Sequence, residues 1–446
     1  MNQFLNVVKK KPNKYPNAVK KRLTSLIMKM SALPSLFVRN PEKDFTRERK
    51  LPFGTMLRLL LYMGGNSICK ELLEEHDYDI DTPTTSAFVQ QRDKILPEAL
   101  EFLFHEFTCS FPDTKTYRGY RLLAIDGSDL HIATDPSDSD TYYQNREGVK
   151  GYNLLHLNAM YYLYSRLYVD AIVQPSKLQN ERKALTDIVD RSHIDKAIII
   201  GDRNYEGYNV FAHIQQKGWN YVIRVKDLDS NGILSGLHLP ATDEFDVHIQ
   251  RILTRKQTKE VKAHPEIYRF IPKNSTFDLL DDTNQFYTMS FRVVRFKVDD
   301  DSYQTIISNL PESAFPPAEL KELYRRRWGI ESSFRELKYS IGLVNFHSKK
   351  TECIIQEIFA RMTMYNFSEM IVSHVVIHLN DAKYEYQVNF TVAIHICRRF
   401  LRLRNNAHPP DVEALIKQNI LPIRPDRKYK RNIRSRSSVS FTYRVA

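Results

Sequence analysis

One stretch decides the fold class of this 446-residue chain: Arg121-Leu-Leu-Ala-Ile-Asp126-Gly-Ser128. It is a short apolar run that stops at an acid and a glycine. The same arrangement returns in Lys196-Ala-Ile-Ile-Ile-Gly-Asp202-Arg203. Continuous apolar runs of this length are typical of strands that are buried on both faces of a sheet. Because functional groups of α/β proteins gather at the carboxyl ends of such strands, Asp126 and Asp202 are candidate site residues.

A third carboxylate comes from Tyr324-Arg-Arg-Arg-Trp-Gly-Ile-Glu331-Ser-Ser-Phe-Arg-Glu-Leu-Lys338. Read as one helix, this segment carries polar residues at spacings of three, four and seven, along one stripe about 60° wide. These residues are Tyr324, Arg327, Glu331 and Lys338. A core-facing stripe should be apolar, so this one is either a solvated face or a site. A single Asp after a strand is more often a turn residue, but two of them and a helix-borne Glu favour the site.

The three carboxylates have no group of cysteines or histidines nearby in the sequence. Such a donor set favours a hard, oxygen-liganded cation, so Mg²⁺ or Mn²⁺ fits and zinc does not. Two such ions can clamp the attacking and the leaving oxygen of an in-line displacement at phosphorus. Arg327 and Lys338 are suited to nearby phosphates, the first as a planar fork and the second as a point charge. The predicted chemistry is phosphoryl transfer.

The pattern Asp…Asp…Glu with Y-x-x-R-x-x-x-E-x-x-x-x-x-x-K resembles the IS4-like DDE transposases of bacterial insertion sequences, which share a YREK signature. All four signature residues are present in this chain. The context of Asp126 is similar to that of the family, and the context of Asp202 departs from it at Asn204, where the family often has Gly. Both residue types tolerate left-handed backbone angles. The resemblance covers roughly residues 121 to 350.

This resemblance implies a ribonuclease H-like core, two divalent metal ions and cut-and-paste transposition of double-stranded DNA. Asp126, Asp202 and Glu331 would be the catalytic residues and the metal ligands, with Mg²⁺ as the cofactor and Mn²⁺ as a substitute. The other signature residues would contact phosphates near the cleaved end. Lys349 and Lys350, just beyond the helix, are a further expected phosphate contact, and a solvated loop is the alternative for them. The partners would be terminal inverted repeats, target DNA and a second copy of the chain.

The order of the expected elements divides the chain into five segments. Residues 1–115 are helical and form an N-terminal DNA-binding domain, and residues 116–225 form the first part of an α/β, ribonuclease H-like core. Residues 226–303 form a β-rich insertion domain that interrupts the core. Residues 304–376 form the second part of the core with the glutamate helix, and residues 377–446 form a C-terminal helical region with a basic tail.

Within the first part of the core, the expected order is β-β-β-α-β-α-β, as a ribonuclease H-like sheet requires. Strands are predicted over 122–125, 154–164 and 167–173, followed by a helix over 181–191 and the strand that ends at Asp202. Glu181 opens that helix near the predicted site. A favourable interaction with the helix dipole is preferred for Glu181 over metal binding. One long helix is predicted from Pro316 to Gly342.

The N-terminal segment contains a candidate DNA-reading helix over residues 81–95. Thr82 or Thr84 could cap this helix, and Pro83 suits its first turn. Its polar side chains, including Arg92, would then be exposed and able to contact DNA, as in the second helix of a helix-turn-helix. A plain surface helix has the same pattern, so both interpretations stay open.

Charge is concentrated at the two ends of the chain. The formal net charge is +12, and residues 1–22 hold seven Lys or Arg and no acid. Residues 421–446 hold eight Lys or Arg and one acid. The runs at Lys9–Lys11, Lys20–Arg22 and Arg424–Arg436 are interpreted as nucleic-acid arms, with solvated disordered tails as the alternative.

The remaining features bear on location and on aromatic contacts. The four cysteines are scattered without metal spacing, and no apolar run reaches membrane-spanning length, which favours a cytoplasmic protein. The family resemblance implies that this cytoplasm is bacterial. Trp328 and Trp219 are candidates to hold a flipped base, but a core position is preferred for each. His156 is expected to pack in the interior or to face water.

Two other functions are compatible with the sequence. One is a ribonuclease H-like nuclease that cuts DNA without strand transfer. The other is a non-catalytic DNA-binding protein derived from a transposase, against which the intact acids argue.

Overall fold

The computed structural model describes residues 13–47, 49–111, 115–144, 148, 150–228, 230–299, 302–375, 385–403 and 409–423. The chain divides into two compact units. The first comprises residues 1–113, 130–155 and 334–446, and the second comprises residues 114–129 and 156–333. These units differ from the five segments expected from the sequence, and that finer division stays a prediction. The basic runs at Lys9–Lys11 and Arg424–Arg436 lie outside the described residues.

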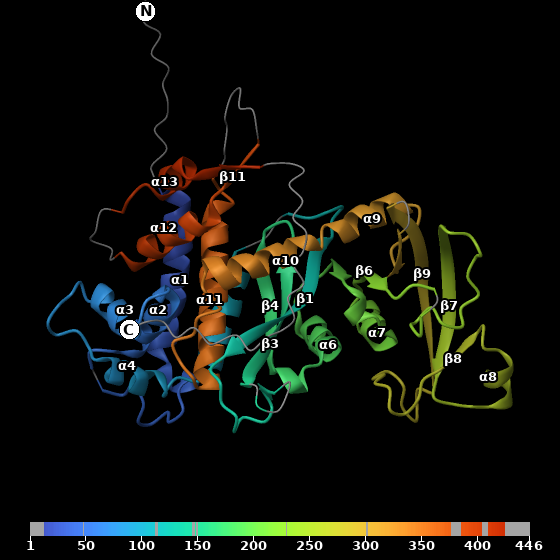
Figure 1. Cartoon of the computed structure of the whole chain (residues 1–446), viewed down its shortest axis with the longest axis horizontal. Helices are drawn as coiled ribbons and strands as arrows, with labels where there is room; N and C mark the ends of the chain where they lie inside the picture. The colour runs from blue at the N-terminus through green and yellow to red at the C-terminus, as the bar shows by residue number, and fades with distance from the viewer. Residues whose placement is uncertain are drawn as a thin grey trace, which may run out of the picture. The chain divides into compact units, whose positions relative to one another are not determined.

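The second unit holds most of a mixed β-sheet (Figure 1). Strand β4 pairs with β3, and the order continues as β3-β1-β5-β6-β10-β9-β7-β8. Strands β1, β5 and β6 are parallel to one another, and β10 runs antiparallel to β6 and β9. The order β4-β3-β1-β5-β6 is the ribonuclease H-like arrangement, and it confirms the predicted α/β core. The strands are β1 (Arg121–Ile132), β3 (Tyr152–Tyr162), β4 (Leu167–Pro175), β5 (Ala197–Gly201), β6 (Asn220–Val225), β7 (Phe245–Thr254), β8 (Tyr268–Phe270), β9 (Phe286–Asp299) and β10 (Ser302–Ser308).

Helices cover both faces of this sheet. The α-helices are α6 (Glu181–Arg191), α7 (Tyr208–Gln216), α8 (Lys259–Ala263), α9 (Pro317–Arg325) and α10 (Trp328–Arg335). Phe211 of α7 stacks on Tyr221 of β6, with ring centroids 4.7 Å apart. The next residue, Val222, is buried in one cluster with Leu320 of α9. Because adjacent strand residues point to opposite faces, α7 and α9 lie on opposite sides of β6.

The core of the second unit is built from the apolar runs that the sequence marked as strands. Leu122, Ile198 and Ile200 are fully buried together with residues of α9. Each such side chain contributes about 1.5–3 kcal/mol relative to an exposed position. The expected β-rich insertion contains β7, β8 and β9, which continue the same sheet beyond β10.

Strand β1 is longer than predicted. The sequence ended it at Asp126, but it continues to Ile132. Only its first half pairs with β5, and that register ends at Ala124 opposite Ile200. Asp126 therefore lies where the parallel pairing stops, not where the strand stops. Gly127 gave a misleading stop signal, because a glycine inside a strand can also mark a close approach of another group.

The single long helix predicted from Pro316 to Gly342 was wrong. Helix α9 ends at Arg325, α10 begins at Trp328, and a π-helical turn follows over Glu336–Ser340. Between the helices, the N–H of Arg327 donates to the carbonyl of Tyr324 at 3.0 Å, a tighter i→i−3 bond than the α-helical one. The four signature residues therefore do not share the one straight stripe that the spacing suggested.

The first unit is mainly helical. Its α-helices are α1 (Lys14–Ala32), α2 (Phe53–Tyr62), α3 (Ile68–Glu75), α4 (Thr85–Arg92), α5 (Glu98–Cys109), α11 (Thr351–Val372), α12 (Phe390–Arg402) and α13 (Val412–Gln418). Its strands are β2 (Tyr142–Tyr143), which pairs with β3, and the hairpin of β11 (Tyr386–Val388) with β12 (Ile420–Pro422). Helix α11 is buried almost throughout and packs against α1, α2, α5 and α12. Across the described part of the chain, no helix is long and apolar enough to cross a membrane.

Candidate active site

Three carboxylates, Asp126, Asp202 and Glu331, form what we call the carboxylate cluster, and all three belong to the second unit. Asp126 comes from the middle of β1, and the N–H of Gly127 donates to its Oδ1 at 2.9 Å. Asp202 follows β5 directly and accepts from the N–H of Asn204 at 2.9 Å. Glu331 lies in the first turn of α10. Two neighbouring parallel strands and one helix thus supply the cluster.

Arg327 is the cation that contacts this cluster. Its Nη2 donates to Oε1 of Glu331 at 2.7 Å, and its Nη1 lies 3.7 Å from Oδ2 of Asp126. The residue is buried, with 8% of its surface exposed. A buried guanidinium needs acidic partners, because its desolvation would otherwise be costly. The helix break at Arg327 therefore brings the signature arginine to the carboxylates of two different elements.

The electrostatics show that this one cation does not balance the cluster. Burial is the largest cause of a raised pKa at Asp126, and the charges of Asp202 and Glu331 add to it. Arg327 and the N–H of Gly127 oppose that rise, and the pKa settles at about 7. Burial also raises the pKa of Asp202. Half-buried carboxylates whose negative charge is only partly offset are suited to take up a further cation.

The cluster was expected to hold divalent cations, and this metal-binding role stays a prediction. Among the described residues, no group of three or more His, Cys, Asp or Glu side chains is arranged to hold a metal ion. The guanidinium of Arg327 contacts Asp126 and Glu331 instead. The donor chemistry still fits a hard divalent cation, because the donors are carboxylate oxygens and Arg327 offsets only part of the negative charge around Asp126.

A family model described as the transposase DDE domain matches residues 117–367. The chain belongs to this family. The match covers more than half of the 446 residues and includes every member of the carboxylate cluster.

One curated relative and one solved structure can be compared with this DDE-domain protein. The chain is 27% identical over 131 residues to the transposase InsG for insertion sequence element IS4 from Escherichia coli (strain K12). That alignment covers 27% of this chain and 29% of the relative, so the chain spans less than a third of the relative's length. A piggyBac transposase in a synaptic complex with hairpin DNA matches at a TM-score of 0.46 and 9% identity, over 87% of this chain and 80% of that chain.

The aromatic side chains beside Arg327 differ in exposure. Its guanidinium lies 5.8 Å from the ring of Tyr324 and 5.4 Å from the ring of Trp328. Tyr324 is buried in the core, but Trp328 is 53% exposed, so the predicted core position of Trp328 was wrong. The core position predicted for Trp219 is confirmed: it is 1% exposed, and its Nε1 donates to the carbonyl of Ile194 at 2.9 Å.

The other basic residues expected to bind DNA lie in the first unit of this DDE-domain protein. Lys338 is half-buried in the π-helical turn, and Lys349 and Lys350 are exposed. The Nζ of Lys350 forms an ion pair with Asp93. These positions leave the two exposed lysines accessible to a polyanion.

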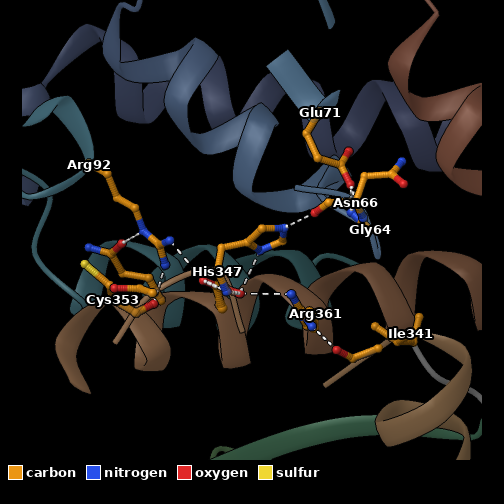
Figure 2. A network of polar contacts seen from close by, with 12 residues as sticks. Gly64, Asn66, Glu71, Arg92, Ile341, His347, Cys353 and Arg361 are labelled. Atoms are coloured by element: carbon orange, nitrogen blue, oxygen red, sulfur yellow. Dashed lines mark hydrogen bonds and ion pairs between the residues drawn. The ribbon is translucent and has the colours of Figure 1, made fainter. Parts of the chain in front are cut away.

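Arg92 corrects one expectation from the sequence. Thr84 caps α4 as predicted, accepting from the N–H of Ala87 at 3.2 Å, but Arg92 is 2% exposed instead of lying on the surface. Its Nη1 donates to Oε1 of Glu357 at 2.9 Å, and its other nitrogens donate to Gln356 and to the carbonyl of Cys353 (Figure 2). Arg92 points inward because α11 offers it a buried carboxylate, so it is not a surface contact for DNA.

Glu357 is the centre of this buried network in the first unit. It accepts from Arg92, from Arg361 Nη2 at 2.9 Å, and from the backbone N–H of His347 at 3.0 Å (Figure 2). Burial alone would raise the pKa of Glu357, but the two guanidinium groups and His347 outweigh burial and hold it well below its usual range. The network joins α4 and α11 to the segment that follows the signature lysine.

Three further side chains, Asp129, His156 and Glu181, form a charged group beside Gly127, and none of them was given a part in the site from the sequence. His156 of β3 is 4% exposed, its Nδ1 lies 2.7 Å from Oδ1 of Asp129, and its Nε2 lies 3.0 Å from Oε1 of Glu181. The packing expected for His156 is confirmed. A sequence signal existed, because His156 is an ionisable residue inside the mostly apolar segment that forms β3.

Proposed function

We propose that this chain is a transposase that binds the ends of an insertion sequence and catalyses metal-dependent DNA cleavage and strand transfer. The observation that carries the proposal is that the transposase DDE domain match includes three coupled carboxylates on two adjacent strands and one helix. The partial similarity to the transposase of element IS4 agrees with it. Cut-and-paste transposition requires both reactions from one site.

Asp126, Asp202 and Glu331 would hold two Mg²⁺ ions, for which Mn²⁺ can substitute. When bound, these ions supply activation of the attacking oxygen and charge stabilisation of the leaving oxygen. The carboxylates themselves fix where the cations sit relative to the scissile phosphate. Arg327 neutralises part of the cluster without DNA, and its planar fork suits two oxygens of a phosphate. No covalent protein–DNA intermediate is required, because water and then a 3′ hydroxyl act as nucleophiles.

Further residues of both units are proposed to contact DNA. Tyr324, Lys338, Lys349 and Lys350 are proposed to contact phosphates near the cleaved end. The exposed ring of Trp328, next to Arg327, is the proposed stacking surface for an unpaired base. A homodimer that bridges two transposon ends, a bacterial cytoplasmic location and the five-segment domain division are parts of the same proposal.

The test is cleavage of DNA that carries the element's own ends by the full chain and by Glu331→Gln. Loss of one catalytic carboxylate should reduce cleavage by at least about a hundredfold while DNA binding is retained. Glu322→Gln is the matched control, because Glu322 lies on the preceding helix and pairs with Arg325 and Arg326, outside the carboxylate cluster. Undiminished cutting by Glu331→Gln would overturn the assignment.

A joining assay separates transposition from simple cleavage. The wild-type chain should transfer the cut ends into a target plasmid. Cleavage without joining would indicate a nuclease of the same core, and metal-independent DNA binding without nicking would indicate a non-catalytic DNA-binding protein.

A further inference from the structure

A second group of charged side chains lies against Gly127, the residue that follows Asp126, in the same unit. His156 of β3 is clamped between Asp129 of β1 and Glu181, the first residue of α6. The distances are 2.7 Å from Nδ1 to Asp129 and 3.0 Å from Nε2 to Glu181. The imidazole is 5% exposed, and the two carboxylates are 21% and 20% exposed. Two strands and one helix are thus joined through a single ring.

This group touches the backbone that carries Asp126. A Cβ atom placed on Gly127 would lie 2.4 Å from Nε2 of His156 and 2.7 Å from Oε1 of Glu181. Such distances are shorter than real Cβ contacts allow, so a side chain at position 127 would displace the imidazole or the carboxylate. The imidazole and the carboxylate therefore pack against the peptide that follows the first carboxylate of the cluster.

The same group also reaches Asp202. Arg182, the neighbour of Glu181, donates from Nε to the carbonyl of Asn204 at 2.9 Å. This bond ties the start of α6 to the turn that Asp202 begins. The negative charge of Glu181 contributes to the raised pKa of Asp202. Glu181 is therefore close to Asp202 in space, although 21 residues separate them in the sequence.

The charges within the group are balanced. Burial would lower the pKa of His156, but its contacts with Asp129 and Glu181 outweigh burial and raise the pKa to about 9. At neutral pH the ring is an imidazolium, and it offsets part of the charge of the two acids.

We propose that Asp129, His156 and Glu181 form a positioning network that fixes the backbone at Asp126 and the turn at Asp202, and thereby sets the affinity of the carboxylate cluster for divalent cations. The inference depends on the proposed function, because it assigns these residues to the support of that site. Side chains that orient metal ligands from behind commonly change metal affinity or activity by about 10–100-fold when they are replaced.

A purely structural ion-pair group makes a different prediction. It would lower the stability of the second unit when broken and leave the metal dependence of the folded protein unchanged. The two possibilities are separated by measuring metal binding directly on folded protein, without relying on cleavage.

The experiment compares the full-length wild type with His156→Gln and Glu181→Gln. Mn²⁺ binding is titrated in the absence of DNA by electron paramagnetic resonance, and the Mg²⁺ concentration for half-maximal cleavage is measured on DNA with the element's ends. Glu181→Gln keeps the shape of the side chain, so it remains informative if His156→Gln does not fold. His213→Gln is the matched control, because His213 also lies between two carboxylates, Asp190 and Asp278, each at 3.0 Å.

Both network variants should bind Mn²⁺ at least about tenfold more weakly than the wild type. They should need a correspondingly higher Mg²⁺ concentration for half-maximal cleavage. At saturating Mg²⁺ their cleavage should largely return to the wild-type level. The control should match the wild type. Wild-type metal affinity in folded Glu181→Gln would overturn the network while leaving the proposed function intact. A wild-type chain that neither binds Mn²⁺ nor cuts DNA would overturn both.

Discussion

The substitution Asp126→Asn should stabilise the metal-free protein at alkaline pH while it abolishes cleavage. Asp126 is half-buried beside two other acids, and the guanidinium of Arg327 does not offset the charge of all three. Like charges that are held close together in an active site lower the folding stability of a protein. Asparagine, which is neutral and has nearly the shape of aspartate, should therefore restore stability. The change keeps the size of the side chain, so it removes the charge with little change in packing.

The magnitude follows from the pKa of Asp126, which folding raises from 3.8 to about 7, chiefly through burial. Below pH 3.8 the carboxyl group is neutral in the folded and the unfolded chain, so asparagine has no advantage there. At higher pH the unfolded chain ionises first, and wild-type stability falls by about 1.4 kcal/mol per pH unit. Above pH 7 the rise of about three pH units gives Asp126→Asn an advantage of about 4 kcal/mol.

The assay is denaturant unfolding in the presence of a chelator at pH 4 and pH 8. The chain has two tryptophans, Trp219 and Trp328, and both lie in the second unit, so their fluorescence reports on the unit that contains Asp126. Asp170→Asn is the matched control. Asp170 accepts from Nε of Arg191 at 2.9 Å, so its neutralisation should lower stability at pH 8.

The expected signature is a gap between Asp126→Asn and wild type that is large at pH 8 and nearly absent at pH 4. Equal stability at pH 8 would refute the claim that the cluster lacks positive charge. A gap of the same size at both pH values would show that the gain has a cause other than ionisation of Asp126.

Three more outcomes are expected. Glu357→Gln should lower the unfolding free energy of the first unit by about 3–5 kcal/mol, because it leaves Arg92 and Arg361 buried without their carboxylate. Because the folded pKa of Glu357 is depressed, this loss of stability should be full above pH 4.5 and should shrink below it when unfolding is followed by helical circular dichroism. A loss of stability that does not change with pH would contradict this cause. Trp328→Ala should change the unfolding free energy by less than about 0.5 kcal/mol, because the side chain is exposed. It should weaken binding to DNA that has an unpaired base near the cut by about 1–3 kcal/mol, as measured by fluorescence anisotropy. Equal DNA affinity of the variant and the wild type would exclude stacking on Trp328. Removal of divalent ions with a chelator should stop cleavage and spare DNA binding, and persistent cutting would argue against a metal-dependent site.

Much of the fold could be predicted from local pattern. The runs before Asp126 and Asp202 are fully buried strands, and the helix predicted over 181–191 has exactly these bounds as α6. Such strands are predictable because burial on both faces requires a continuous apolar run. This run can be recognised in the sequence without knowing which strand pairs with it. The end of β1 was not predictable in this way, since a glycine inside a strand and a glycine after one look the same in sequence.

The site was predicted less completely. The spacing around Glu331 identified the signature residues, but the exposure of Trp328 and the burial of Arg92 depend on which neighbours each helix meets. Arg92 is drawn inward by Glu357, which is 265 residues away in the sequence. No local pattern reveals such a partner.

The sequence by itself determined which residue types are available and which strands must be buried, because hydrophobic periodicity and charge are properties of short segments. Only the tertiary structure decided that Arg327 meets two carboxylates from different elements, that Asp126 is left with a pKa near neutrality, and that His156 joins Asp129 to Glu181 behind it. Electrostatic energies depend on distances in space and on the water that packing excludes, and both are set when the chain folds.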